Sequence, residues 1–440
     1  MWFSAMSLNG AKSNPGVFNE IVLAGPRWSV APDRGDREPV AYLEQPPDTE
    51  ALPASGAWFP GHHPGRRKFF DFGVDRAFAL EAGGSLRGAT VAYETWGQLD
   101  ATASNAVLVC HALTSDSHAV GEPESGHPGG GWWNQFLGAG QSIDPDRYFI
   151  VCANLVGGCQ GSTGPSSIDP ETGTYYAASF PTVTIRDNVR IQALLASHLG
   201  INSWLAVVGG SMGGMTALEW AVTYPGRVRG LVALATTPAA TAQQISWSFS
   251  GRSSVLADIR FRGGDYYDAG PGRGPHAGLM AARMLAMVHY RSDGEFTRRF
   301  NRLSSRHGSP FEDGHMFDVE RYLAYQAHKF VRRFDANTYL VLNRMMDLHD
   351  VGRKRGGVAK ALERVSCPLF TASVTSDHLY PEYQQLQIKG ALDARGIDTT
   401  HVLIDTDTGH DGFLTDADQV APAVGEFIDG LYKDLPTGGD

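Results

Sequence analysis

The stretch Leu205–Met215 constrains the fold of this chain more than any other part of the sequence. Its first four residues are apolar, as in a buried strand, and the residues after Ser211 have the composition of a helix. The pattern Gly209-x-Ser211-x-Gly213 between them is that of a nucleophile elbow. In such a turn small neighbours allow the serine hydroxyl to point out of the sheet. An ordinary strand-to-helix loop is the alternative. We predict that Ser211 is a catalytic nucleophile.

Short apolar runs recur along the chain and alternate with helical patterns. The runs cover residues 107–110, 148–152, 205–208, 231–234, 369–372 and 400–404. Helical patterns over 185–199 and 212–224 lie between them, and residues 69–80 and 86–95 precede them as a predicted meander. Strands that are apolar throughout and alternate with helices indicate an α/β fold, in which helices cover both faces of a mostly parallel sheet.

The pattern changes between residues 237 and 360, where strand runs give way to predicted helices over 277–290, 293–303, 319–332 and 336–347. We interpret 237–360 as an all-helical insertion that covers the site as a lid. Residues 66–236 and 361–440 then form the core. Residues 1–65 are rich in proline, glycine and acidic side chains and predict an irregular extension that wraps the surface or is partly disordered.

Composition narrows the class of protein. The net charge of −10 argues against general binding to nucleic acid or to anionic membranes. The four cysteines form no C-x-x-C pair, and we predict no metal site. The chain has no apolar run near the ~20 residues that span a bilayer, and no signal-peptide pattern at its start. We therefore expect a soluble cytoplasmic protein.

A serine nucleophile needs a base, and the base needs a carboxylate that orients it. In the predicted fold these partners follow the serine in the order acid, then histidine, each just after a strand. Asp377 follows the run 369–372, and His410 follows the run 400–404. We predict that Asp377 and His410 complete a triad with Ser211.

Other residues near these positions fit less well. His378 adjoins the predicted carboxylate and His401 lies within a predicted strand, so we interpret both as structural. Asp405 and Asp407 compete with Asp377, but they precede His410 in its own loop, from which the far side of its ring is harder to reach.

An oxyanion hole needs two backbone N–H groups. One is expected from Met212, the residue after the nucleophile. We assign the second to Leu113, in the loop that follows the run 107–110.

Many segments together resemble the homoserine O-acetyltransferases, acyltransferases with the α/β-hydrolase fold. The matching segments are 91–97 (VAYETWG), 111–114 (HALT), 131–133 (GWW), 143–149 (IDPDRYF), 157–165 (GGCQGSTGP), 210–215 (GSMGGM), 290–292 (YRS), 376–381 (SDHLYP) and 409–414 (GHDGFL). They span about residues 70 to 430, and the resemblance says nothing about residues 1–65.

The resemblance implies a two-step transfer of acetyl from acetyl-CoA, through acetyl-Ser211, to the side-chain hydroxyl of L-homoserine. The product, O-acetyl-L-homoserine, would serve methionine biosynthesis. Acetyl-CoA would be a co-substrate, with no permanently bound cofactor. The resemblance also implies that Arg283 holds the carboxylate of the amino acid and Asp411 its amino group. A homodimer through the lid helices is expected on the same ground.

The residues alone leave alternatives open. An esterase or other hydrolase would have the same triad, and homoserine or serine O-succinyltransferases are variants of the same chemistry. Gly210 before the nucleophile and the segment 157–159 resemble the acetyl-transferring, homoserine-using members.

Overall fold

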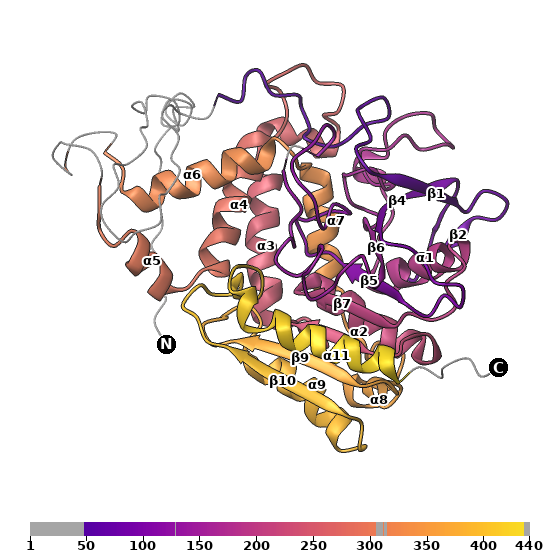
Figure 1. The fold of residues 1–440 in the computed structure, drawn as a ribbon. Helices are drawn as coiled ribbons and strands as arrows, with labels where there is room; N and C mark the ends of the chain where they lie inside the picture. Colours follow the sequence, from indigo (N-terminus) through magenta and orange to yellow (C-terminus); the bar gives the residue numbers. More distant parts are fainter. Residues whose placement is uncertain (1–47, 128, 305–310, 312–314, 435–440) are drawn as a thin grey trace.

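The computed structural model describes residues 48–127, 129–304, 311 and 315–434 (Figure 1). In this part of the chain an eight-stranded sheet has the order β1-β4-β6-β5-β7-β8-β9-β10. The strands are β1 (Lys68–Phe72), β4 (Ala89–Trp96), β5 (Ala106–Cys110), β6 (Phe149–Ala153), β7 (Ala206–Gly210), β8 (Leu231–Leu234), β9 (Leu369–Val374) and β10 (Thr399–Ile404). From β6 to β10 neighbouring strands are parallel, while β1 and β4 add an antiparallel edge. A short hairpin of β2 (Phe78–Ala79) and β3 (Ser85–Leu86) interrupts the predicted meander.

The central strands are apolar throughout because both of their faces are buried. Along β5, Leu108 packs into one hydrophobic cluster while Val107 and Val109 pack into the other. The first cluster includes α1 (Ile185–His198), α2 (Met212–Thr223), α8 (Val358–Leu362) and α9 (Glu382–Asp393). The second includes α10 (Gly412–Thr415), α11 (Ala421–Lys433) and the loop 119–143. The predicted α/β-hydrolase fold with a mostly parallel sheet is confirmed.

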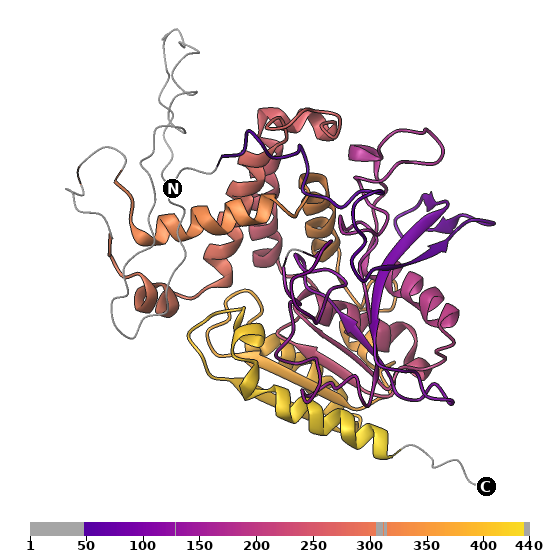
Figure 2. The same ribbon diagram turned by 45° about the horizontal axis from the view of Figure 1, so that its top comes forward.

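Between β8 and β9 the chain forms helices that lie at one end of the sheet (Figures 1 and 2). They are α3 (Ala242–Leu256), α4 (His276–Tyr290), α5 (Asp293–Arg299), α6 (Asp318–Val331) and α7 (Ala336–Asp347). Helix α4 packs against α3 and α6, and α3 also packs against α7. We call this segment the lid.

Two details of the lid differ from the sequence prediction. Helix α3 was not predicted, because its serines weaken the apolar pattern; Ser246, Ser250 and Ser254 each donate a hydrogen bond to the carbonyl four residues earlier. A capping box at Thr241 and the packing against α4 and α7 support this helix instead. Helix α5 ends at Arg299 rather than at 303, because Asn301 has a positive φ of 47°.

The described part of the N-terminal segment is irregular and packs on the lid. The Gly56 N–H donates to the Phe334 carbonyl at 3.2 Å, and the Ser55 hydroxyl donates to Asp335 at 2.7 Å. The rest of the predicted extension, residues 1–47, lies outside the described residues. Among the helices in the described ranges, none has the length and apolar character needed to cross a membrane.

Candidate active site

The turn between β7 and α2 is shaped by close backbone contacts. Ser211 has φ 58° and ψ −126°, a conformation that a non-glycine residue rarely adopts. A Cβ atom on Gly213 would lie 2.0 Å from the Cys110 carbonyl oxygen, and one on Gly209 would lie 2.4 Å from the Gly213 carbonyl carbon. Both positions therefore require glycine. The contact with Cys110 also fixes the turn against the end of β5.

Ser211, His410 and Asp377 meet at the carboxyl ends of β7, β10 and β9. The Ser211 Oγ lies 2.9 Å from His410 Nε2, and His410 Nδ1 lies 2.7 Å from Asp377 Oδ2. The other oxygen of Asp377 accepts hydrogen bonds from the Leu379 and Tyr380 amides at 2.8 and 2.9 Å. All three side chains are buried. The structure thus brings together the three residues predicted as a triad, in the geometry of an activated nucleophile.

The electrostatics of His410 suit a general base. Burial lowers the pKa of His410, but the charge of Asp377 and its hydrogen bond raise it, as does the charge of Asp411 more weakly. The net effect raises the pKa of His410 above its usual 6.5. Asp377 therefore stabilises the protonated form of His410.

The residues that competed for these roles lie elsewhere. His378 is exposed, and His401 Nε2 lies 3.5 Å from Glu382. Asp407 pairs with Arg298 at 2.9 Å, and Asp405 is exposed.

The backbone amides of Met212 and Leu113 were predicted to form an oxyanion hole. Met212 is the first residue of α2, and Leu113 lies in the loop 111–118 after β5, which we call the oxyanion loop. In the described part of the chain neither amide donates a hydrogen bond to a protein group. The Met212 amide also lies at the positive end of the α2 dipole. Both amides are thus available to an oxyanion.

A buried carboxylate behind the oxyanion loop holds this loop in place. Glu94 on β4 accepts hydrogen bonds from the Ser117 hydroxyl at 3.1 Å and from His118 Nδ1 at 3.0 Å, and His127 Nε2 lies 3.1 Å from Glu94 Oε1. Burial would raise the pKa of Glu94, but hydrogen bonds from the two histidines outweigh it and lower the pKa to about 2. Glu94 is therefore ionised and acts only as an acceptor.

The same three residues, Glu94, His118 and His127, are the metal-ligand candidates of the described chain. Their geometry fits an ion poorly. The two imidazole rings are stacked, with centroids 4.1 Å apart and planes 11° from parallel. A histidine ligand points its lone pair at the metal within the ring plane, and stacked rings cannot both do so. We interpret the group as a hydrogen-bonded cluster.

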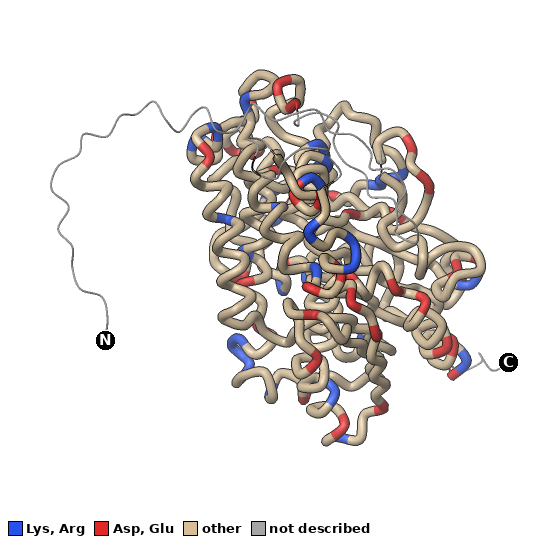
Figure 3. The backbone as a smooth tube through the Cα atoms, turned by 90° about the vertical axis from the view of Figure 1, so that its left-hand side faces the viewer, with Lys and Arg blue, Asp and Glu red and all other residues tan. Residues whose placement is uncertain are grey.

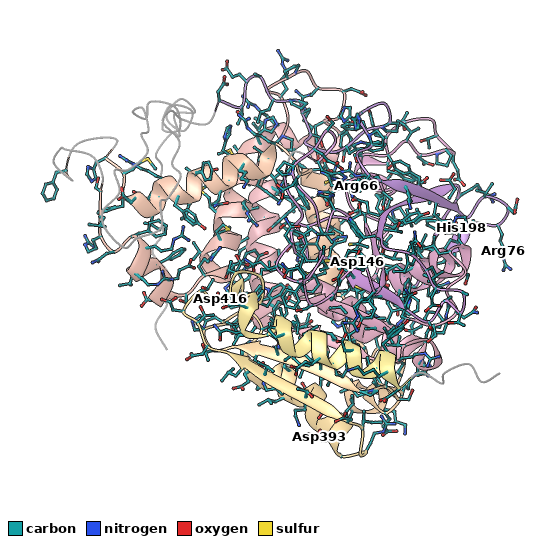
Figure 4. The ribbon with its side chains drawn as sticks, viewed as in Figure 1. Arg66, Arg76, Asp146, His198, Asp393 and Asp416 are labelled. Carbon is teal, nitrogen blue, oxygen red and sulfur yellow. The ribbon has the colours of Figure 1, made fainter. Side chains whose placement is uncertain are left out.

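Side chains from the lid close over Ser211. The space left beside the serine is small, about 30 Å³, and its lining includes Leu113, Trp247, Tyr290, Tyr339, Asn343 and Tyr380. The Tyr380 and Tyr290 rings lie 5.1 and 5.9 Å from the His410 ring, centroid to centroid. From the sequence, some aromatic residues of the insertion, Trp247 and Tyr339 among them, are expected to face the site or a partner subunit. No place in the site was predicted for Tyr290 and Tyr380, although both lie in the segments that carry the resemblance. Figure 4 shows side chains filling the region between the lid and the sheet, whereas the labelled Arg76 and Asp393 lie at the edge of the molecule.

Arg283 and Asp411, the two residues predicted to bind the amino-acid substrate, do not form an ion pair with each other in the described structure. Arg283, on α4, is half-buried, its Nε has no hydrogen-bond partner in the described structure, and its guanidinium carbon lies 5.2 Å from the Phe330 ring. Asp411 instead forms an ion pair with Arg291, at 3.1 Å between Oδ2 and Nη2. Arg291 was not predicted from the sequence as the partner of Asp411. It appears in the sequence analysis only within the matching segment 290–292.

The raised pKa of His410 generates a prediction for the pH dependence of acylation. Only the neutral imidazole accepts a proton, so hydrolysis of p-nitrophenyl acetate should rise with pH through an apparent pKa above 6.5. Asp411→Asn removes a charge that raises the pKa of His410, so the rising limb should move to lower pH. The control Asp405→Asn, an exposed charge in the same loop, should leave the limb in place. A profile that Asp411→Asn does not move would contradict the assignment of His410 as the base.

Known proteins match this chain over most of its length. The family described as alpha/beta hydrolase fold matches residues 105–417. The homoserine O-acetyltransferase of Thermobifida fusca (strain YX) is 49% identical over 380 residues, which cover 86% of this chain and 98% of that protein.

Solved structures agree with this fold. The homoserine O-acetyltransferase from Bacillus anthracis superposes with a TM-score of 0.76 at 26% identity, covering 82% of this chain and 97% of that one. Esterase E22 superposes with a TM-score of 0.75 at 27% identity, covering 82% and 99%. The structural likeness alone therefore does not separate transferases from esterases, whereas the sequence identity over nearly the whole of the Thermobifida protein does. The chain belongs to the homoserine O-acetyltransferase family, whose members have the α/β-hydrolase fold.

Proposed function

We propose that this protein transfers an acetyl group from acetyl-CoA to the side-chain hydroxyl of L-homoserine, through an acetyl-Ser211 intermediate. The observation that carries the proposal is the continuous hydrogen-bonded line Ser211–His410–Asp377 beneath a closed helical lid. The line supplies an acyl-accepting nucleophile, and the lid limits access of water to the acyl-enzyme. Family membership supports the identity of the donor and the acceptor.

In the first step the Ser211 oxygen attacks the thioester carbonyl as its proton passes to His410 Nε2. The carbonyl oxygen becomes an oxyanion beside the Leu113 and Met212 amides. As the intermediate collapses, the carbon–sulfur bond breaks and His410 gives the proton to the departing sulfur. Acetyl-Ser211 and free CoA result.

In the second step the homoserine hydroxyl attacks acetyl-Ser211 while His410 takes its proton. The bond between the Ser211 oxygen and the acetyl carbon breaks, and the proton returns from His410 to the serine. O-acetyl-L-homoserine leaves, and the enzyme is restored. The two proton transfers between Ser211 and His410 run between atoms that already lie 2.9 Å apart.

We propose that Arg283 binds the carboxylate of homoserine and that Asp411 attracts its ammonium group. The buried Nε–H of Arg283 has no partner in the described structure, which suits a carboxylate ligand. Burial raises the pKa of Tyr339, which lines the cavity, to about 12, and the charge of Arg283 opposes that rise, which indicates that the guanidinium lies near the cavity. Asp411 keeps one oxygen outside its ion pair with Arg291.

The reaction as proposed needs no permanently bound cofactor and no metal, because acetyl-CoA brings the activated acyl group and the triad moves the protons. We also propose a cytoplasmic location. All four cysteines are buried and free, which suits a reducing compartment.

A comparison of CoA release with and without an acceptor tests the proposed transfer. With acetyl-CoA alone release should be slow, and L-homoserine should accelerate it at least about tenfold, because the lid disfavours water as acceptor. Succinyl-CoA and L-serine serve as the competing donor and acceptor. Ser211→Ala should lose about 10⁴-fold or more of the activity, while Ser250→Ala, an exposed serine on α3, should retain it. Equal release with and without homoserine would favour an esterase.

We further propose a homodimer formed through the lid. Large apolar residues are exposed on its two packed helices: Ile245, Phe249 and Leu256 on α3, and Leu285 and Val288 on α4. Burial of such a patch in a symmetric interface would remove this apolar area from water.

Sedimentation should give twice the chain mass for the wild type and the chain mass for Phe249→Asp, because the charge would be buried in the interface. Val74→Asp, at an equally exposed apolar residue outside the lid, should remain dimeric. A monomeric wild type would remove the proposal.

A further inference from the structure

A second pocket adjoins the active site across the oxyanion loop. Leu113 lines the cavity beside Ser211, whereas the next residues, Thr114 and Ser115, line the second pocket. This pocket has a volume of about 420 Å³, and the residues used below line it: Arg67, Thr114, Asp116, Lys329, Arg332 and Arg333. We call it the basic pocket.

The lining of the basic pocket carries an excess of positive charge. Within the described residues no carboxylate lies within ion-pair distance of Lys329, Arg332 or Arg333. Arg67 adds a fixed charge, because its guanidinium donates only to the Gln160 side chain and to carbonyl oxygens. Asp116 is the acidic residue among the lining, and its carboxylate already accepts a hydrogen bond from a backbone amide. The charge of Asp116 acts on both Arg67 and Arg333, so it offsets part of this excess. Figure 3 shows basic and acidic segments interspersed, so the excess is a local feature.

Part of this charge has a structural explanation. Lys329 lies in the last turn of α6 and Arg332 at its C-cap, where cations interact favourably with the helix dipole. The dipole does not explain Arg333, which follows the helix. Arg333 is half-buried, and its Nη1 donates to the Thr114 carbonyl at 2.7 Å. Burial lowers the pKa of Arg333, so its charge is held at a cost that an anionic ligand would offset.

The basic pocket lies close to Arg283, which we propose as a ligand of homoserine. The guanidinium carbons of Arg283 and Arg333 lie 5.2 and 5.9 Å from the centroid of one ring, that of Phe330. Helix α4, which carries Arg283, also supplies Tyr290 to the lining of the cavity beside Ser211. An extended ligand whose reacting end lies at Ser211 could therefore place its other end among Lys329, Arg332 and Arg333.

We propose that the basic pocket binds the phosphate groups of the CoA acyl donor. This inference rests on the proposed function. CoA joins its thiol, through a flexible neutral arm, to a nucleotide that carries a diphosphate and a 3′-phosphate. Arginine and lysine are the side chains that bind such groups. The exposed Lys329 and Arg332 make the first contacts, and Arg333 holds the inner phosphate while it supports the oxyanion loop through Thr114.

The test compares two donors that share the acetyl thioester and differ in the phosphates: acetyl-CoA and S-acetyl-N-acetylcysteamine. The measured quantity is the ratio of their kcat/KM values with homoserine as acceptor. In Lys329→Ala/Arg332→Ala this ratio should fall about tenfold or more, mainly through KM for acetyl-CoA. Arg229→Ala, at an exposed arginine two residues before β8, should keep the wild-type ratio. Arg333 is left intact because it contacts the oxyanion loop.

A second measurement identifies the source of the phosphate. Acetyl-dephospho-CoA lacks only the 3′-phosphate, so its ratio to acetyl-CoA shows which phosphate the pocket holds. Inorganic pyrophosphate should compete with acetyl-CoA and not with the short thioester. If the double variant leaves the ratio unchanged, either because it loses no activity or because it loses equally with both donors, the inference is overturned. Failure of the proposed function has a different sign: in the wild type, homoserine would not accelerate thiol release from either donor.

Discussion

The contact between Gly213 and the Cys110 carbonyl sets the geometry on which the rest of the site depends. A Cβ atom at Gly213 would lie 2.0 Å from that oxygen, so only glycine allows the start of α2 to approach the end of β5 this closely. The approach places Met212 beside the loop that carries Leu113. It also holds Ser211 in its strained turn at the carboxyl end of β7. One packing contact thus brings Ser211 and the two proposed oxyanion donors together.

The base and the acid reach the nucleophile because the sheet is parallel. The carboxyl ends of β7, β9 and β10 lie on the same side of the sheet. The residues that follow these strands therefore meet there, although they are far apart in sequence. Asp377 is fixed by two backbone amides, and it fixes His410 in turn. The lid completes the site from above with Trp247, Tyr290 and Tyr339. These rings limit the room for water beside Ser211, as the proposed transfer to another acceptor requires.

The parts of this arrangement that follow local rules could be predicted from the sequence. The buried strands, the elbow at Ser211 and the order of Asp377 and His410 rest on apolar runs, glycine spacing and chain order. Helix α3 could not be predicted, since packing against α4 and α7 supports a serine-rich segment there. The contacts of Glu94 with His118, and of Asp411 with Arg291, join residues brought together only by the fold. No local pattern distinguishes such a buried pair from solvated charges.

The central claim is that Ser211 carries the acyl group between two substrates. The most direct measurement is the mass of the Ser211 peptide after brief exposure to acetyl-CoA without an acceptor. The account predicts one acetyl group on Ser211, which disappears when L-homoserine is added as O-acetyl-L-homoserine forms. An enzyme that turns over without any acyl group on Ser211, or an acetyl-Ser211 that homoserine does not discharge, would contradict it.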